Sequence, residues 1–509
     1  MRTNLKRILL GLLVLSILLT GIYTVNPKGE AVDAAQSISS FATEKDNPVT
    51  KTPKYIFLFV GDGMSYPQVQ ATSYYLGTTT NKGAIKAKSL GFMDFPVAGS
   101  AETYDSTSFC PDSASTATSL ATGYKTYSGT INMDTSMTIK YETITEKLKK
   151  QLGYKIGIIS SVNINHATPA AFYAHQTSRN NYYEIGLEMI ESDFDYFAGG
   201  ALKNPTGANK DQKDLYQLAK DAGYHVVKTQ NAADQLNAKS GKSIVIASTL
   251  ADSDAMSYDI DAKADEWRLS DYVKKGIEVL DGNQGFFMMV EGGKIDWACH
   301  ANDAASSIQD TLALSNAVDV ALEFYKKHPD ETLILVTGDH ETGGLTIGFA
   351  GTDYDTYLTN LKNQKISYAK FDTDYVAKYK ADDTKFSLVL KDIEKFFGLV
   401  AEENATAATP ATLLLSNYEY SKLLDAYTLT LEEDKTRNQE EYVMYGSYEP
   451  LTVTITHILN NKSGIDFSSY SHTGIPVPVF AIGNGSHLFE GYYDNTDIYL
   501  NLKKLTAVK

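Results

Sequence analysis

Six short apolar runs constrain the fold of this chain more than any other feature. Each is five or six residues long and rich in β-branched or aromatic side chains. A strand that is apolar at nearly every position is covered on both of its faces, whereas a half-exposed strand alternates apolar and polar residues. The runs therefore predict buried strands of one sheet, at residues 55–60, 156–160, 243–247, 286–290, 333–337 and 478–482.

Helical patterns lie between these runs. One covers residues 143–151, and a longer one places Leu314, Val318, Leu322 and Tyr325 on a single helical stripe. Alternation of buried strands with helices is typical of a three-layer α/β/α sandwich around a mainly parallel sheet.

We expect one large domain, made of residues 53–352 and 449–509, with an insertion at residues 353–448. The insertion is rich in Tyr, Lys, Asp and Asn and shows no clear buried strand. Three interpretations stay open for this peripheral, crown-like region: a cap over a site, an oligomer surface, or a decoration without a role in function.

The N-terminus has the pattern of a secretory signal. Arg2, Lys6 and Arg7 precede an apolar run at residues 8–25, and small residues follow at 31–35. Residues 1–35 therefore predict a signal peptide, with an uncleaved membrane anchor as the alternative. Residues 36–52 are polar and are expected to form a flexible leader. The expected location is outside the cell, in the periplasm or in the cell envelope.

Charge and cysteine content exclude some classes of function. A formal net charge of −16 argues against a nucleic-acid-binding surface and gives no overall attraction for anionic ligands. Two cysteines, Cys110 and Cys299, are too few for a disulfide scaffold. A single bond between them is compatible with an exported protein, and the sequence leaves it open.

Ser113 is the candidate nucleophile. Pro111 ends any preceding helix, and Asp112 or Ser113 can cap the small-residue helix that follows. A serine at this position lies where unpaired helix amides favour an oxyanion. The alternative is an ordinary helix cap, and the local sequence does not decide between the two.

Oxygen and nitrogen ligands follow three of the predicted strands. Asp62 follows the first run, Glu291 begins a segment after the fourth, and Asp339 and His340 follow the fifth. Because ligands bind outside the carboxyl ends of strands in open α/β sheets, these side chains are expected to converge. A single histidine is more often structural, but Asp296, His300 and His472 complete a pattern that suits zinc, with Asp296 and His300 one helical turn apart.

The motifs, taken in order, resemble those of the alkaline phosphatase family. The resemblance covers most of the chain from residue 55 to residue 485, outside the insertion, and implies the fold of that family. It rests on residues 57–64 (FLFVGDGM), 111–118 (PDSASTAT), 166–169 (HATP), 289–293 (MVEGG), 336–340 (VTGDH) and 471–474 (SHTG).

The resemblance implies a role for each matched residue. It assigns one zinc to Asp296, His300 and His472, a second zinc to Asp62, Ser113, Asp339 and His340, and a magnesium to Asp62, Thr168 and Glu291. Arg179 matches the residue that binds the phosphate group. The activity implied is hydrolysis of phosphate monoesters, with broad specificity at alkaline pH, through a phosphoserine intermediate. A homodimer is also implied.

Two positions depart from the enteric bacterial pattern of the family. His166 stands in place of an aspartate, and Trp297 stands in place of a lysine. Both are expected near the third metal or the phosphate group, so the metal of the third site stays open.

Three other functions compete with hydrolysis of phosphate monoesters. A phosphodiesterase or a sulfatase could use a similar fold, but the sulfatase motif Cys-x-Pro-x-Arg is missing, because Pro111 follows Cys110 directly. Ser113 together with Arg179 favours monoesters over diesters. A non-catalytic exported protein that binds metal or phosphate is the alternative from a different class.

Overall fold

The computed structural model describes residues 51–432 and 436–509. The predicted signal peptide at 1–35 and residues 36–50 of the leader lie outside the described residues. Among the helices that the described residues form, none combines the length and the apolarity that a membrane span requires.

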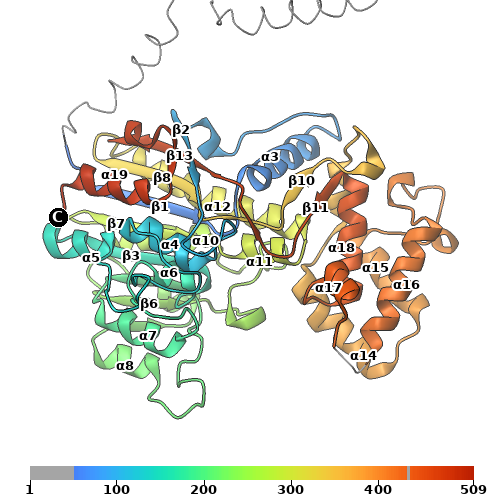
Figure 1. Ribbon diagram of the computed structural model, residues 1–509, viewed down its shortest axis with the longest axis horizontal. Helices are drawn as coiled ribbons and strands as arrows, with labels where there is room; N and C mark the ends of the chain where they lie inside the picture. Colours follow the sequence, from blue (N-terminus) through green and yellow to red (C-terminus); the bar gives the residue numbers. More distant parts are fainter. Residues whose placement is uncertain (1–50, 433–435) are drawn as a thin grey trace, which may run out of the picture. The chain divides into compact units, whose positions relative to one another are not determined.

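A ten-stranded sheet forms the centre of the described part of the chain (Figure 1). All six predicted strands are present in it, as β13, β8, β1, β7, β3 and β6. The spatial order is β14 (Gly491–Asp494), β2 (Val97–Glu102), β13 (Val477–Gly483), β8 (Thr332–Gly338), β1 (Tyr55–Gly61), β7 (Phe286–Glu291), β3 (Lys155–Asn163), β4 (Tyr196–Gly200), β6 (Ser243–Ile246) and β5 (His225–Val227).

The sheet is mainly parallel, as predicted. Strand β13 is the exception, because it runs antiparallel to both β2 and β8, while the other pairings in this sheet are parallel. Every residue of β1, β7 and β8 is buried, which agrees with their continuous apolar runs. The sequence did not reveal β2, β4, β5 and β14. Strands β2, β5 and β14 are partly exposed and carry a weak apolar signal. Strand β4 is fully buried, but its five residues end in two glycines, which weakens the strand pattern.

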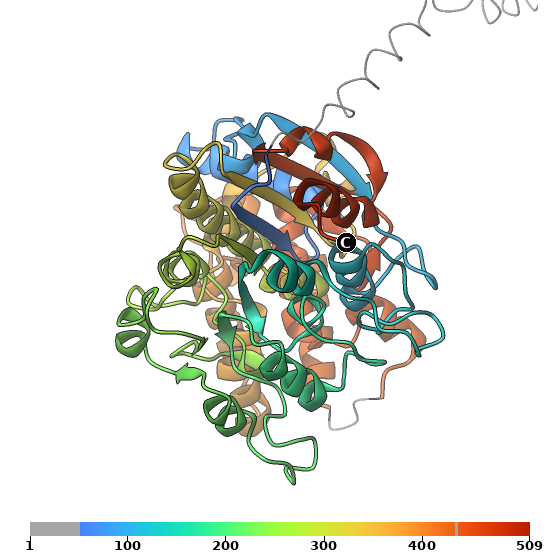
Figure 2. The ribbon, with the colours of Figure 1, turned by 90° about the vertical axis from the view of Figure 1, so that its left-hand side faces the viewer.

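Helices cover both faces of the sheet, which gives the three predicted layers (Figure 2). The predicted helix at 143–151 is present as α5, continued by a π-helical turn at Leu148–Leu152. One layer contains α3 (Tyr66–Thr80), α10 (Leu269–Leu280) and α12 (Ala304–Tyr325), and the other contains α4 (Ser113–Thr122), α5 (Ile144–Lys147), α6 (Ala167–Ala170) and α19 (Thr496–Thr506).

Helix α4 is buried along its whole length. Its residues are Ser, Ala and Thr apart from Leu120, and all of them are buried. Small side chains let the helix lie close to α6 and α19, because neither neighbour has to make room for long side chains. The helix that begins at Ser113 is therefore held rigidly.

The expected insertion is helical. Its main helices gather beside the sheet with α18, in orange in Figure 1. Phe371, Ile393, Leu423 and Ile455 belong to one buried cluster, so α18, which begins after residue 448, packs with the insertion. The helices are α13 (Tyr368–Phe371), α14 (Ala377–Asp382), α15 (Phe386–Phe397), α16 (Asn417–Leu431), α17 (Gln439–Tyr445) and α18 (Pro450–Ser463).

The register of the central strands aligns their carboxyl ends. Gly61 of β1 pairs with Gly338 of β8, and Val60 pairs with Glu291 at the end of β7. The residues that follow these glycines therefore leave the sheet at the same level. This confirms the expectation that the polar residues after the predicted strands share one edge of the sheet.

Gly338 is required at this edge by close packing. A Cβ atom at this position would lie 1.9 Å from the backbone oxygen of Met64. Because the contact is with backbone, relief needs a shift of the strand end. We expect Gly338→Ala to lower the free energy of unfolding by about 1–3 kcal/mol, the usual cost of overpacking. Thermal denaturation followed by circular dichroism measures the effect.

Gly282→Ala is the matched control. A Cβ atom there would lie 3.2 Å from the end of the flexible Gln284 side chain, and Gly282 does not adopt a positive φ angle. The control should unfold within about 1 °C of the wild type, since Gly282 is only partly buried in a loop and the side chain that its Cβ atom would meet can move aside. Equal unfolding temperatures for Gly338→Ala and the wild type would contradict the packing explanation.

Candidate active site

Ser113 lies at the first position of α4, as expected for an oxyanion site. Asp112 is the N-cap residue, and its carboxylate accepts a hydrogen bond from the Ser115 amide at 3.0 Å. The amides of the first two helical residues have no partner within the helix. The Ser113 side chain is buried, and its Oγ lies 3.2 Å from His340 Nε2 and 3.5 Å from Asp62 Oδ1.

Asp62, Asp339 and His340 form one buried group beside this serine. The Nε2 atom of His340 lies 3.3 Å from Asp62 Oδ1 and 3.4 Å from Asp339 Oδ2. Burial raises the pKa of Asp62 well above its ordinary value, and the nearby carboxylates add to the rise. Burial and the charge of Asp296 raise the pKa of Asp339 to about 7. The group fits a divalent cation, because a cation offsets the repulsion between buried carboxylates.

Asp296, His300 and His472 form a second group. The Nδ1 atom of His300 donates to the carbonyl oxygen of Tyr470 at 2.6 Å, and that of His472 donates to the carbonyl oxygen of Pro111 at 2.5 Å. A carbonyl only accepts, so these Nδ1 atoms carry protons, which leaves Nε2 of each ring as the atom that can bind a cation. Burial lowers the pKa of His300, but the charge of Asp296 outweighs it and raises that pKa in the absence of metal.

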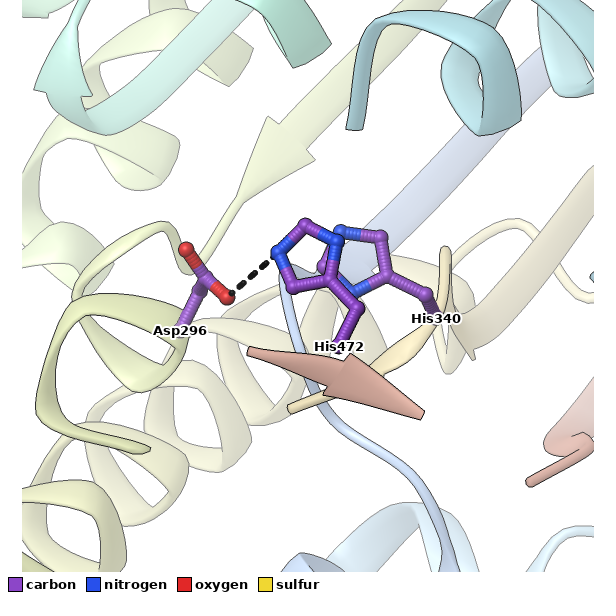
Figure 3. Close-up of side chains that lie close together, drawn as sticks. All are labelled: Asp296, His340 and His472. Carbon is purple, nitrogen blue, oxygen red and sulfur yellow. Dashed lines mark ion pairs between the residues drawn. The ribbon is translucent and has the colours of Figure 1, made fainter. Parts of the chain in front are cut away.

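The lone pairs of His300 and His472 face one another. Their Nε2 atoms are 3.1 Å apart, and they lie 3.3 and 3.5 Å from Asp296 Oδ1. Two facing lone pairs repel unless a proton or a metal ion lies between them, so the second group also fits a cation with nitrogen and oxygen ligands. Figure 3 shows the carboxylate of Asp296 turned towards His472, whose ring stacks on that of His340 at a centroid distance of 3.7 Å.

A third group consists of oxygen atoms. Thr168 Oγ1 donates to Asp62 Oδ2 at 3.3 Å, and Ser160 Oγ donates to Glu291 Oε2. The other Glu291 oxygen is buried and has no hydrogen-bond partner among the described residues. Burial raises the pKa of Glu291 to about 7. An all-oxygen set with one open carboxylate oxygen fits a hard cation such as Mg²⁺.

His166 and Trp297, the two departures from the enteric pattern, are neighbours. Their rings meet edge to face with centroids 5.9 Å apart. The buried Nδ1 of His166 has no hydrogen-bond partner in the described parts of the chain. Burial, together with the charge of Arg179, lowers the pKa of His166 to about 3. His166 is therefore neutral and offers nitrogen as an acceptor or ligand.

Arg179 is paired with Asp112. Its Nη1 donates to Asp112 Oδ2 at 2.8 Å. Burial disfavours the charge of Asp112, but the Arg179 guanidinium and two backbone amides outweigh it and hold the pKa of Asp112 below its ordinary value. Sequence analysis predicted only the helix-capping role of Asp112. The pairing joins residues 67 positions apart, and no local pattern signals it.

Ser113, Arg179, the pair His166 and Trp297, and the second group line a cavity of about 410 Å³. The sequence analysis missed four of its lining residues: Asp252, Ser253, Tyr368 and Tyr448. The full lining is Ser113, His166, Arg179, Asp252, Ser253, Asp296, Trp297, His300, Tyr368, Tyr448 and His472. The two cysteines are not bonded to each other, since Cys110 is exposed with a free thiol and Cys299 is buried with a free thiol.

Comparison with known proteins identifies the family. The family model described as alkaline phosphatase matches residues 53–508. The chain belongs to the alkaline phosphatase family. Members of this family are metal-dependent hydrolases of phosphoric monoesters, so the chain is an enzyme of that class.

Relatives cover nearly the whole chain. Alkaline phosphatase 4 of Bacillus subtilis strain 168 is 30% identical over 504 residues, which are 97% of this chain and 95% of the relative. The crystal structure of a cold-active alkaline phosphatase from a psychrophilic Shewanella species matches with a TM-score of 0.71 and 29% identity, over 89% of this chain and 99% of that one. A variant of the TAB5 alkaline phosphatase with Mg bound in its M3 site matches with a TM-score of 0.60 and 26% identity, over 90% and 99%.

The raised carboxyl pKa values predict how the metal-free enzyme responds to pH. The pKa values of Asp339 and Glu291 rise from 3.8 and 4.5 to about 7 on folding, so the folded state binds their protons more tightly than the unfolded chain. This contribution to stability is complete below the unfolded pKa values and is lost as the pH rises through about 7. We expect the unfolding temperature of EDTA-treated enzyme to fall between about pH 4 and pH 8, and added Zn²⁺ and Mg²⁺ to restore it at pH 8.

Asp339→Asn is the control for this effect, because it removes one of the titrating carboxyl groups while keeping a similar shape. Its metal-free form should lose less stability over the same pH range. An identical pH dependence for wild type and variant would contradict the assignment to Asp339.

Asp112→Asn separates the capping role of Asp112 from its pairing with Arg179. Asparagine caps helices as well as aspartate does, so α4 should remain stable. The ion pair with Arg179 is lost, and the guanidinium is then less firmly held. We expect the inhibition constant of inorganic phosphate to rise by about three- to tenfold, from the loss of one charge-assisted hydrogen bond.

Asp112→Ala removes the cap as well, and should lower the unfolding temperature where Asp112→Asn does not. An unchanged inhibition constant in Asp112→Asn would show that Arg179 needs no partner to bind phosphate.

Proposed function

We propose that the enzyme hydrolyses phosphate monoesters of broad structure at alkaline pH, through a phosphoserine on Ser113, with two zinc ions and a third ion, Mg²⁺. The observation that carries the proposal is the position of Ser113 Oγ at the first turn of α4, 3.2 Å from His340 and 3.5 Å from Asp62. A nucleophile and a cation-binding group thereby meet at a helix N-terminus, where phosphate binds well.

The proposed ligand sets follow from the three groups of side chains. One zinc would be held by Asp296, His300 and His472, the second by Asp62, Ser113, Asp339 and His340, and Mg²⁺ by Asp62, Thr168 and Glu291. The ring of His340 also lies close enough to Asp296 and His472 to share a metal ion with them. The lone pairs of His300 and His472 and the open oxygen of Glu291 support these sets. When bound, the ions would lower the pKa of the serine hydroxyl and of a water molecule, and would offset charge on the entering and leaving oxygens.

The residues of the chain then perform the transfer in two steps. The Ser113 hydroxyl gives up its proton to solvent and its Oγ attacks phosphorus in line, the bond to the ester oxygen breaks, and the alcohol leaves with a proton from solvent. Water next attacks the phosphoserine, the bond between Oγ and phosphorus breaks, and inorganic phosphate is released. Arg179 would bind two phosphate oxygens, and the first amides of α4 would stabilise charge on the oxygens during both steps.

His166 and Trp297 complete the proposal at the third site. His166 offers a neutral nitrogen with no partner in the described residues, so zinc can compete with Mg²⁺ there. The Mg-bound variant of the TAB5 enzyme supports an Mg²⁺ site in a relative of similar fold. Export through the segment at 1–35 and assembly as a homodimer remain predictions from the sequence.

Ser113→Ala tests the central step. We expect the variant to lose at least about 10³-fold in turnover of p-nitrophenyl phosphate and to form no acid-stable phosphoprotein with labelled phosphate, because no hydroxyl accepts the phosphoryl group. Ser119→Ala is the matched control, since Ser119 is buried in the same helix and does not line the cavity. Ser119→Ala should keep the turnover of the wild type and should still form acid-stable phosphoprotein with labelled phosphate.

Two further measurements on the same purified protein test the proposal. Metal analysis should find about two zinc ions for each chain, and bis-p-nitrophenyl phosphate should react far more slowly than the monoester. Dominant cleavage of the diester, or labelled phosphoprotein in Ser113→Ala, would overturn the proposal.

A further inference from the structure

Three aromatic side chains line the cavity together with the phosphate-binding residues. Trp297 comes from α11 (Lys294–His300), Tyr368 begins α13, and Tyr448 lies between α17 and α18. Each of the three is half-buried. A cavity of about 410 Å³ has room for more than a phosphate group, and the group esterified to the phosphate must lie in the remaining space.

The three rings are held in place by their surroundings. Tyr368 packs edge to face on Tyr448 and on Tyr258, with centroids 5.8 and 5.7 Å apart, and its hydroxyl bonds with that of Tyr258 at 3.1 Å. Trp297 lies between the His166 ring and the ammonium group of Lys294, which is 4.4 Å from the indole centroid. Such a surface is ordered before a ligand arrives, so binding costs little side-chain entropy.

The Lys294 side chain serves this surface and not the phosphate. It is fully buried, and its Nζ donates to Asp252 Oδ1 at 2.6 Å. The same ammonium group lies 4.1 Å from the Tyr258 centroid, so it contacts Trp297 directly and also contacts Tyr258, which packs on Tyr368. Because its charge is paired with Asp252, it is not available to an anionic substrate.

The insertion is tied to the main body where it supplies Tyr368. The Ser367 amide donates to Asp261 Oδ1 at 2.9 Å, and the Tyr368 amide donates to Asp303 Oδ2 at 3.0 Å. Both acceptors are carboxylates of the main body, so these bonds are charge-assisted. Tyr368 is therefore fixed at the rim of the cavity by its own backbone.

The charges of the lining restrict the substrate further. Among the lining residues, all of which lie in the described part of the chain, Arg179 is the only lysine or arginine, and it is already paired with Asp112. Asp252 adds a carboxylate. A leaving group that carries a second anionic group gains no ion pair here, whereas a neutral ring gains three aromatic contacts.

We propose that Trp297, Tyr368 and Tyr448 form a leaving-group subsite that favours, among the phosphate monoesters that the enzyme hydrolyses, those of neutral aromatic alcohols. This inference rests on the proposed function, and it gives the insertion a role in substrate selection. Aromatic contacts of this kind change affinity by roughly two- to tenfold.

The test compares benzyl phosphate with ethyl phosphate, because their leaving alcohols have similar acidity and the chemistry of the two reactions is alike. We expect kcat/KM of the wild type to favour benzyl phosphate by roughly three- to tenfold, and Tyr448→Ala and Tyr368→Ala each to reduce this preference by about twofold or more. Tyr448→Phe keeps the ring and should keep the preference.

Tyr354→Ala is the matched control, since Tyr354 belongs to the same insertion and is fully exposed. It should leave the preference unchanged. A wild-type ratio near one, or an unchanged ratio in both Tyr368→Ala and Tyr448→Ala, would overturn the proposed subsite. A loss in Tyr448→Phe equal to that in Tyr448→Ala would assign the effect to the hydroxyl and would also overturn it.

Binding of benzylphosphonate and ethylphosphonate, measured by calorimetry, separates this inference from the proposed function. Phosphonates lack the ester oxygen and are not hydrolysed, so their affinity ratio reports the subsite even where no turnover occurs. Tighter binding of benzylphosphonate without hydrolysis of either ester would support the subsite and overturn the phosphatase mechanism. Equal affinity for both phosphonates, together with rapid hydrolysis of the esters, would overturn the subsite and support the phosphatase mechanism.

Discussion

Four carboxylates buried at one edge of the sheet impose the constraint on which the rest of this structure depends. Asp62, Glu291, Asp296 and Asp339 are all almost fully removed from solvent. Buried anions of like charge repel one another and are poorly solvated, so they stay ionised only beside cations. Cations bound at this edge would keep the four carboxylates ionised. Their surroundings would be provided by the carboxyl ends of the strands, the facing histidines and the first turn of α4.

The sheet and the helix contribute different parts of the same site. The register of β1, β7 and β8 brings Glu291 and the residues after Gly61 and Gly338 to one level. Helix α4 belongs to the layer that also contains α5, α6 and α19, and its first turn lies at the same edge of the sheet. Its small residues allow close packing. The proposed nucleophile therefore comes from a rigid helix, and four of the proposed cation ligands, Asp62, Glu291, Asp339 and His340, come from the ends of central strands.

The insertion lies outside the group of strand ends and helix α4 that forms this centre. It packs around its own apolar cluster with α18, and it reaches the cavity through Tyr368. Hydrogen bonds to Asp261 and Asp303 fix that contact. In the proposed subsite, two of the three rings, Tyr368 and Tyr448, come from the insertion and Trp297 comes from α11 beside Asp296, so a change in the insertion could alter substrate selection without changing the metal-binding groups.

The sequence by itself determined the central strands, the mainly parallel sheet and the residues at its carboxyl edge, because continuous apolarity and position after a strand are local properties. It also indicated the family through ordered motifs. Only the tertiary structure decided that Arg179 pairs with Asp112, that the two cysteines are unbonded and that Tyr368 and Tyr448 reach the cavity. These features depend on contacts between residues far apart in the chain, and such contacts leave no pattern in the sequence around either partner.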